Sequence, residues 1–323
     1  MNSYDKTLRP EDYVEPRCVL CDEPYGKMPQ VKAIPQQRII EKMNAYMSCR
    51  DYAGAERHLL YWLEEARLGF DRRGELLVCN ELVGHYRKVN DKEKALVYGE
   101  KALSLIKELA FEGTISAGTT YVNVATACNA FGENERAMSL FEKARAAYED
   151  HAFSAGQGID GESGGSAGQI VYGNREGFAE QSVYGDHAVE RNAAGTDPSL
   201  LGGLYNNMAL TCVSLGRFEE AYDLYQKALE QMKQVKGGAL EQAITWLNIA
   251  NAIEYEQGME AGETKIFDCL DNAENLLRDQ EAPRDGYYAF VCEKCAPTFS
   301  YYGYFLTAEE LQKTAEEIYR EAD

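Results

Sequence analysis

The chain has 323 residues, of which 45% are hydrophobic and 27% charged, a composition typical of an ordinary globular protein rather than a disordered or membrane-spanning chain. Its formal net charge of −20 argues against partners such as nucleic acid or an anionic membrane surface, because both require clustered Lys and Arg. Nine cysteines and a start that lacks the basic and apolar regions of a secretory signal lead us to expect a cytoplasmic protein.

Residues 1–34 carry four prolines and show no helical period, which predicts an extended N-terminal arm. Cys18 and Cys21 form a C-x-x-C pair within this arm. Their spacing suits a zinc or redox role, but an arm that is simply ordered is the favoured interpretation.

Two downstream segments, Tyr121–Arg145 and Tyr205–Leu229, repeat one pattern of small and aromatic residues. Each predicts a first helix with a central alanine, a glycine that ends it, and a second helix with an alanine and an aromatic residue. Small residues let two antiparallel helices approach closely, and a glycine supplies the positive φ of a helix end. The paired positions are Ala125 and Ala209, Gly132 and Gly216, Ala137 and Ala221, and Phe141 and Tyr225.

Weaker copies bring the number of repeats to six, with a spacing of about 42 residues. This pattern resembles the tetratricopeptide repeat family, and its repeat length is similar to that of kinesin light chains. The resemblance implies an all-α fold, a right-handed α-solenoid in which antiparallel helix pairs form a superhelix. Repeats 1–3 are expected in residues 35–150, and repeats 4–6, including a C-terminal cap, in residues 197–323.

Residues 151–196 separate the two blocks. Ala137 and Ala221 are 84 residues apart, twice the repeat length, and the intervening segment is rich in glycine. A Gly-rich insertion and a decayed repeat are both compatible with this spacing, and the glycine content favours the insertion.

The sequence contains no recognisable catalytic or metal-binding motif. A second C-x-x-C pair, Cys292 and Cys295, could join Cys18 and Cys21 in a four-thiolate zinc site. The repeat register instead places Cys295 directly before the packing residue Ala296, so both thiols are expected in the core. With no nucleophile elbow and no Gly-Lys-Ser/Thr phosphate loop, we expect no enzyme, no cofactor and no metal.

Candidate binding residues lie two positions before each packing alanine. Two residues advance 200° around a helix, so such side chains point away from the alanine-lined seam. The residues are Asn123, Asn207 and Asn248, followed by Lys294 in the last repeat, with Glu41 and Glu81 in the first two.

The resemblance implies that this face is the concave groove, where kinesin light chains and chaperone-binding members of the family hold a peptide backbone with asparagines. The residues that should complete the groove are Asn206, Asn251, Tyr255 and Tyr301.

These observations predict a scaffold that is not an enzyme and that binds an extended peptide of a protein partner through an asparagine ladder. In the main alternative, the arm of residues 1–34 fills the groove and partners bind the convex face. An enzyme of unrecognised type is the third hypothesis.

Overall fold

The computed structural model describes residues 31–155, 197–279 and 284–322, which form twelve α-helices and no strand. The first six helices are α1 (Gln36–Ser48), α2 (Tyr52–Leu68), α3 (Arg72–Lys88), α4 (Lys92–Glu108), α5 (Ile115–Ala130) and α6 (Asn134–Ala155). The last six are α7 (Pro198–Ser214), α8 (Phe218–Met232), α9 (Ala239–Gln257), α10 (Met259–Leu277), α11 (Gly286–Tyr301) and α12 (Phe305–Ala322).

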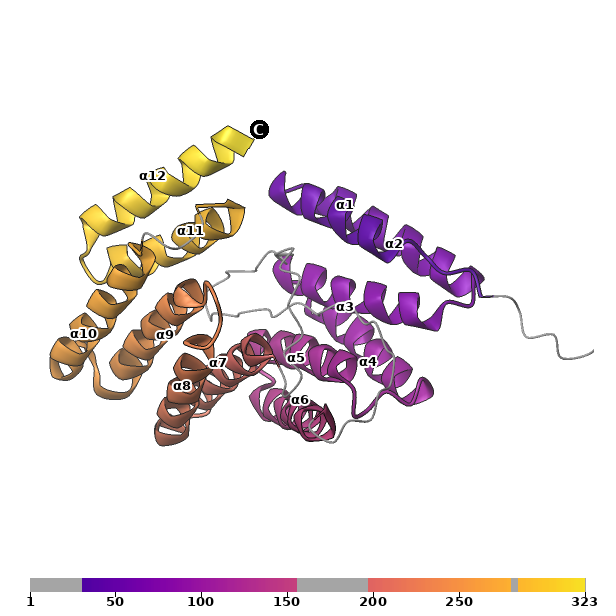
Figure 1. Ribbon diagram of the computed structural model, residues 1–323, viewed down its shortest axis with the longest axis horizontal. Coiled ribbons are helices and arrows are strands. Elements are labelled where there is room, and N and C mark those ends of the chain that lie inside the picture. The colour runs from indigo at the N-terminus through magenta and orange to yellow at the C-terminus, as the bar shows by residue number, and fades with distance from the viewer. Residues whose placement is uncertain (1–30, 156–196, 280–283, 323) are drawn as a thin grey trace, which may run out of the picture.

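Consecutive helices pack as six antiparallel pairs, and the pairs follow one another along an arc (Figure 1). The odd-numbered helices α3, α5, α7, α9 and α11 lie on the inner side of this arc, and the following even-numbered helices lie on its outer side. This is the predicted all-α solenoid.

The seam within each pair is built from the small residues that the repeat pattern identified. Ala125, Ala137, Ala209 and Ala221 are all fully buried, which lets the paired helices approach closely. Gly132 and Gly216 end α5 and α7 with φ values of +79° and +73°, as predicted. Four earlier helix ends reach the same conformation without glycine, at Arg50, Phe70, Asn90 and Ala110.

Inner and outer helices are buried to different extents. In α5 every residue from Ala117 to Cys128 is buried, whereas in α8 only one face is, at six positions such as Ala221 and Tyr225. An outer helix therefore packs through one apolar stripe, whereas an inner helix packs against neighbouring helices on nearly every side. Polar side chains on an inner helix are correspondingly enclosed by neighbouring elements.

The two halves of the arc are continuous. Helix α6 packs directly against α7, so the third and fourth pairs are neighbours. Helix α6 extends to Ala155, five residues past the expected end of the third repeat at 150. Most of the expected insertion, residues 156–196, lies outside the described part of the chain, and so do residues 1–30 of the expected arm.

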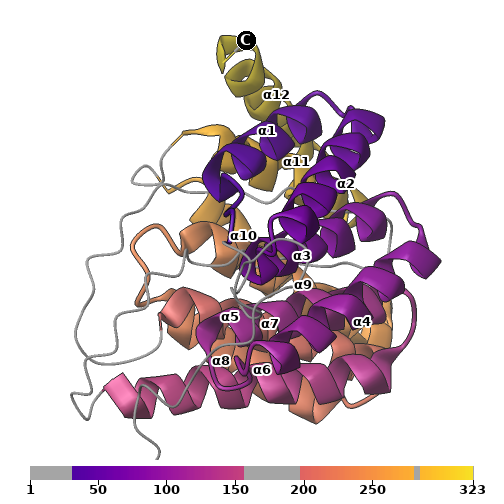
Figure 2. The ribbon, with the colours of Figure 1, turned by 90° about the vertical axis from the view of Figure 1, so that its right-hand side faces the viewer.

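The two ends of the arc come together. The turn between α1 and α2 lies opposite α11, and Arg50 Nη2 forms an ion pair with Glu293 Oε1 at 3.2 Å (Figures 1 and 2). Tyr319 of α12 donates a hydrogen bond to the other oxygen of Glu293, at 3.5 Å. Arg50 and Glu293 are 243 residues apart in sequence, so the first and last helix pairs are in contact.

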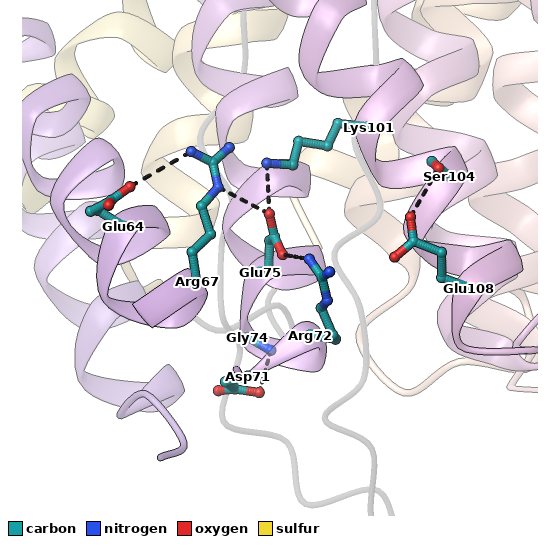
Figure 3. Close-up of polar contacts among 9 residues, drawn as sticks. All are labelled: Glu64, Arg67, Asp71, Arg72, Gly74, Glu75, Lys101, Ser104 and Glu108. Atoms are coloured by element: carbon teal, nitrogen blue, oxygen red, sulfur yellow. Dashed lines mark hydrogen bonds and ion pairs between the residues drawn. The ribbon is translucent and has the colours of Figure 1, made fainter. Parts of the chain in front are cut away.

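A buried carboxylate ties the second helix pair together. Glu75 of α3 is 1% exposed and forms ion pairs with Arg67 of α2, Arg72 of α3 and Lys101 of α4 (Figure 3). Burial alone would raise the pKa of Glu75, but the three cations lower it below its ordinary value. The carboxylate thus stays charged and links three helices.

The cysteines of α11 belong to the core, as the repeat register predicted. Cys292 and Cys295 are buried, and burial raises the pKa of each thiol to about 12, so both are neutral. Cys18 and Cys21 lie outside the described residues. Within the described ranges, no group of three or more His, Cys, Asp and Glu residues is arranged to hold a metal ion. Every helix in the same ranges falls short of the length and apolar character needed to cross a bilayer.

Candidate functional site

The three asparagines of the predicted ladder lie on consecutive inner helices. Asn123 is on α5, Asn207 on α7 and Asn248 on α9, and all three are buried. Their helices lie on the inner side of the arc (Figure 1). We call the side chains on this side of α3, α5, α7, α9 and α11 the inner face.

Asn123 pairs with an asparagine from the preceding repeat. Its Nδ2 donates to Asn80 Oδ1 of α3 at 3.4 Å, and Asn80 Nδ2 donates to Thr120 Oγ1 of α5 at 3.0 Å. The two amides therefore connect the inner helices of the second and third pairs. This inter-repeat contact gives Asn123 a structural role in addition to the predicted binding role.

A second asparagine pair joins the fourth and fifth helix pairs. Asn248 Nδ2 donates to Asn206 Oδ1 at 3.1 Å, 42 residues away in sequence. Asn207 Nδ2 donates to the backbone carbonyl of Gly203 at 2.9 Å within its own helix. Each of the three predicted ladder amides therefore uses one of its N–H donors in a hydrogen bond within the protein.

Each asparagine pair nevertheless leaves one buried polar atom without a partner among the described residues. These atoms are Oδ1 of Asn123, an acceptor, and Nδ2 of Asn206, a donor. The side chains are 9% and 1% exposed, so bulk water reaches them poorly. A buried unpaired polar group costs about 1–3 kcal/mol, and a ligand that pairs with it recovers that cost.

The end of the inner face near the last repeat is lined with tyrosines and acids. Tyr301 is exposed and donates to Glu254 Oε1 at 2.7 Å, while Tyr302 donates to Asn251 Oδ1 at 3.0 Å. Tyr255 is also exposed and packs beside the Phe218 ring, with ring centres 6.2 Å apart. The predicted groove residues Asn251, Tyr255 and Tyr301 thus border this end, and exposed aromatic rings there can contact a ligand.

Two ionisable groups on α3 and α11 have pKa values displaced in the direction that favours the neutral form. The pKa of Lys294 on α11 is lowered to about 7 by burial, opposed by Cys295 and reinforced by the nearby charges of Arg87 and Lys88. Burial also raises the pKa of Glu81 on α3 to about 7. Glu41 is instead exposed on α1, where it accepts a hydrogen bond from Gln37, so it does not join this group.

Sequence reasoning missed two contributors, Asn80 and Arg87. Asn80 lies two residues before the buried Leu82, whereas the predicted residue of this repeat was Glu81, one position later. Arg87 of α3 is buried and its charge lowers the pKa of Lys294 on α11, and the repeat pattern contains no signal for this long-range proximity.

Comparisons with known proteins bear on the fourth and fifth helix pairs. Residues 200–261, from α7 to the start of α10, match the tetratricopeptide repeat family. No curated protein matches the chain. Among solved structures, the crystal structure of BtubC (BKLC) from P. vanneervenii is similar, with a TM-score of 0.42 and 15% sequence identity, over 90% of this chain and 92% of that chain.

Proposed function

We propose that this tetratricopeptide repeat protein is a non-enzymatic scaffold that binds an extended peptide segment of a protein partner along its inner face. Repeats of this kind stack helix pairs so that neighbouring inner helices present equivalent positions at regular intervals. An extended peptide also repeats its backbone groups at regular intervals, so the two surfaces are matched in periodicity. The seven described cysteines are free thiols, which fits the reducing cytoplasm as the place of this function.

The observation that carries the proposal is the pair of unsatisfied amide atoms. Asn123 Oδ1 can accept from a peptide N–H, and Asn206 Nδ2 can donate to a peptide carbonyl. Because these groups recognise the backbone, they bind without specifying a side chain. Selectivity would come from the tyrosines and charged groups on the same face.

The proposal is tested by selecting ligands from a library of random peptides displayed against the full chain. We expect Asn123→Ala and Asn206→Ala each to weaken binding of the selected peptides by a few-fold to about tenfold. Asn80→Ala is the matched control for Asn123, because it breaks the same inter-repeat hydrogen bond but keeps Asn123 Oδ1. Equal losses in Asn80→Ala and Asn123→Ala would show that the effect is structural, and selected peptides unaffected by either Asn123→Ala or Asn206→Ala would contradict the proposed site.

The alternative, in which residues 1–34 occupy the inner face, needs a separate arm of the experiment. Backbone N–H groups of Lys32 and Ile34 donate to Gly69 O at 2.8 Å and to Asp71 Oδ2 at 2.9 Å, so this end of the segment is fixed to the turn between α2 and α3. A deletion of residues 1–30 leaves both contacts intact. Peptide binding that strengthens strongly on this deletion would favour self-occupancy, whereas unchanged affinity would support an inner face open to a partner.

A further inference from the structure

Exposed large apolar side chains lie around two neighbouring helix turns. One turn joins α9 to α10 and the other joins α11 to α12, and the inner helices α9 and α11 pack against each other. On the second turn, Phe305 is 67% exposed and Leu306 is 84% exposed. A contiguous exposed apolar patch is typical of an interaction surface. We call the exposed residues of the two turns the turn patch: Tyr255, Met259, Tyr301, Phe305 and Leu306.

Hydrogen bonds hold the two turns against each other. Tyr301 and Tyr302, at the end of α11, reach the two oxygens of Glu254 near the end of α9, each at 2.7 Å. Tyr304, which begins the second turn's return into α12, donates to Asp271 Oδ1 of α10 at 2.7 Å. The turn patch is therefore one surface, built jointly by the fifth and sixth helix pairs.

The carboxylates beside the patch accept hydrogen bonds from neutral groups. Glu254 accepts from tyrosine hydroxyls, and Glu256 accepts from the Tyr222 hydroxyl at 2.8 Å. The hydrogen bonds from Gln257 and Tyr222 lower the pKa of Glu256 below its ordinary value, so this carboxylate is ionised. A hydroxyl or an amide satisfies a carboxylate's need for donors but leaves its negative charge in place.

Earlier in the solenoid, acids between repeats meet cations instead. Lys92 Nζ, for example, lies 3.0 Å from Glu133 Oε1 and joins the second and third helix pairs. Residues 251–265, at the first of the two turns, contain four glutamates and one lysine. That lysine, Lys265, donates to the Gln257 amide oxygen at 3.3 Å. The turn patch is thus an apolar surface bordered by net negative charge, which is complementary to a ligand that is both apolar and basic.

Helix α9 connects the turn patch to the proposed peptide site. Asn248, Asn251 and Tyr255 follow one another at spacings of three and four residues, so they share one side of α9. Asn248 donates to Asn206, which is 1% exposed and whose Nδ2 has no partner among the described residues. Tyr255 lies about 10 Å along the helix from Asn248, a distance that about three residues of an extended peptide cover.

We propose that the turn patch binds a basic and apolar flank of the peptide held on the inner face. Arginine or lysine side chains of the flank face Glu254 and Glu256, and its apolar side chains pack against Phe305 and Leu306. The exposed tyrosine rings also attract a guanidinium over their faces, which favours arginine. This inference rests on the proposed function, since the flank continues from the segment that pairs with the asparagines.

The test uses three libraries of displayed peptides that share a random core and differ in a flank of about four residues. The flank alternates leucine with arginine, glutamine or glutamate, and each flank is placed at either end of the core. For a selected core, the arginine flank should bind about tenfold more tightly than the glutamine flank, and the glutamate flank should bind most weakly. The preference should shrink between about 0.05 M and about 0.5 M salt, because salt screens exposed charges.

A double variant tests the two carboxylates. Glu254→Gln combined with Glu256→Gln keeps an acceptor oxygen for each tyrosine hydroxyl but removes both charges, so it should reduce the arginine preference to about twofold or less. The matched control combines Glu316→Gln with Glu317→Gln, the same charge change at exposed positions of α12, and should keep the full preference.

A second pair of variants tests the apolar part of the patch. Leu306→Ser should weaken binding of every leucine-containing flank by a few-fold and leave the core alone unaffected. Leu68→Ser, at an exposed leucine of α2 that is 67% exposed, is the control and should bind like the wild type. If the wild type instead sediments as a dimer that Leu306→Ser dissociates, the patch is an interface between two copies of the chain and the inference is overturned.

The outcomes separate the inference from the proposed function. If no library yields binders, the proposed function fails and the inference fails with it. If a selected core loses affinity in Asn206→Ala but binds equally with every flank, only the inference is overturned. An arginine preference that survives in the Glu254 and Glu256 double variant would overturn the inference as well.

Discussion

Glu81 of α3 has a pKa raised by burial, and a prediction about stability follows from this shift. Because the folded-state pKa is about 7 against an ordinary 4.5, the native protein retains a proton that the unfolded chain releases between these values. The free energy of unfolding should therefore fall as pH rises through this window. Glu81→Gln, which stays neutral, should stabilise the protein by about 1–3 kcal/mol at about pH 8 and have little effect at about pH 4.

Urea denaturation at both pH values checks this expectation, with Glu309→Gln on the exposed side of α12 as the control. The same gain at both pH values would show that the effect does not come from the titration of Glu81.

At the scale of the helices, a prediction concerns how Glu75 holds α2, α3 and α4 together. Its carboxylate joins α2, α3 and α4 through Arg67, Arg72 and Lys101, and it is nearly inaccessible to solvent. Removing the charge of Glu75 leaves three partly exposed cations without their shared buried partner, and breaking a buried ion pair costs up to about 3–5 kcal/mol. We expect Glu75→Gln to lower the free energy of unfolding by an amount of that order. Glu64→Gln, at an exposed acid that contacts the same Arg67, should cost less than about 1 kcal/mol.

The helices themselves could be predicted because each pair carries its own signals. Ala125, Gly132 and Ala137 define close packing and a turn within a single stretch of sequence, so no distant residue is needed to read them. The asparagine pairs could not be read in this way. Asn123 meets Asn80, 43 residues earlier, while Asn248 meets Asn206, 42 residues earlier, and a register error of one residue selects the wrong partner.

At the scale of the whole molecule, the closure of the arc was not predictable. It depends on small rotations between successive pairs, which accumulate over six repeats and are set by side-chain packing at each interface. The contact of Arg50 with Glu293 follows from this accumulated geometry rather than from any local motif.

The direct packing of α6 against α7 leads to a whole-molecule prediction. Since the third and fourth pairs already share an interface, residues 156–196 should be dispensable for the continuity of the solenoid. Replacing them with a Gly/Ser linker of about ten to fifteen residues should preserve a single cooperative unfolding transition. Two separate transitions in a calorimetric scan would instead show that this segment couples the two halves, as expected of a decayed repeat.

The central claim is that the inner face recognises a peptide backbone, and a backbone N-methylation scan of a selected peptide tests it most directly. N-methylation removes one N–H at a time without changing any side chain. We predict that one position loses about tenfold in affinity for the wild type, because its N–H donates to Asn123 Oδ1, and that this loss disappears in Asn123→Ala. If every methylated peptide binds as well as the parent, or if the loss is the same in Asn123→Ala, the backbone-recognition account is contradicted.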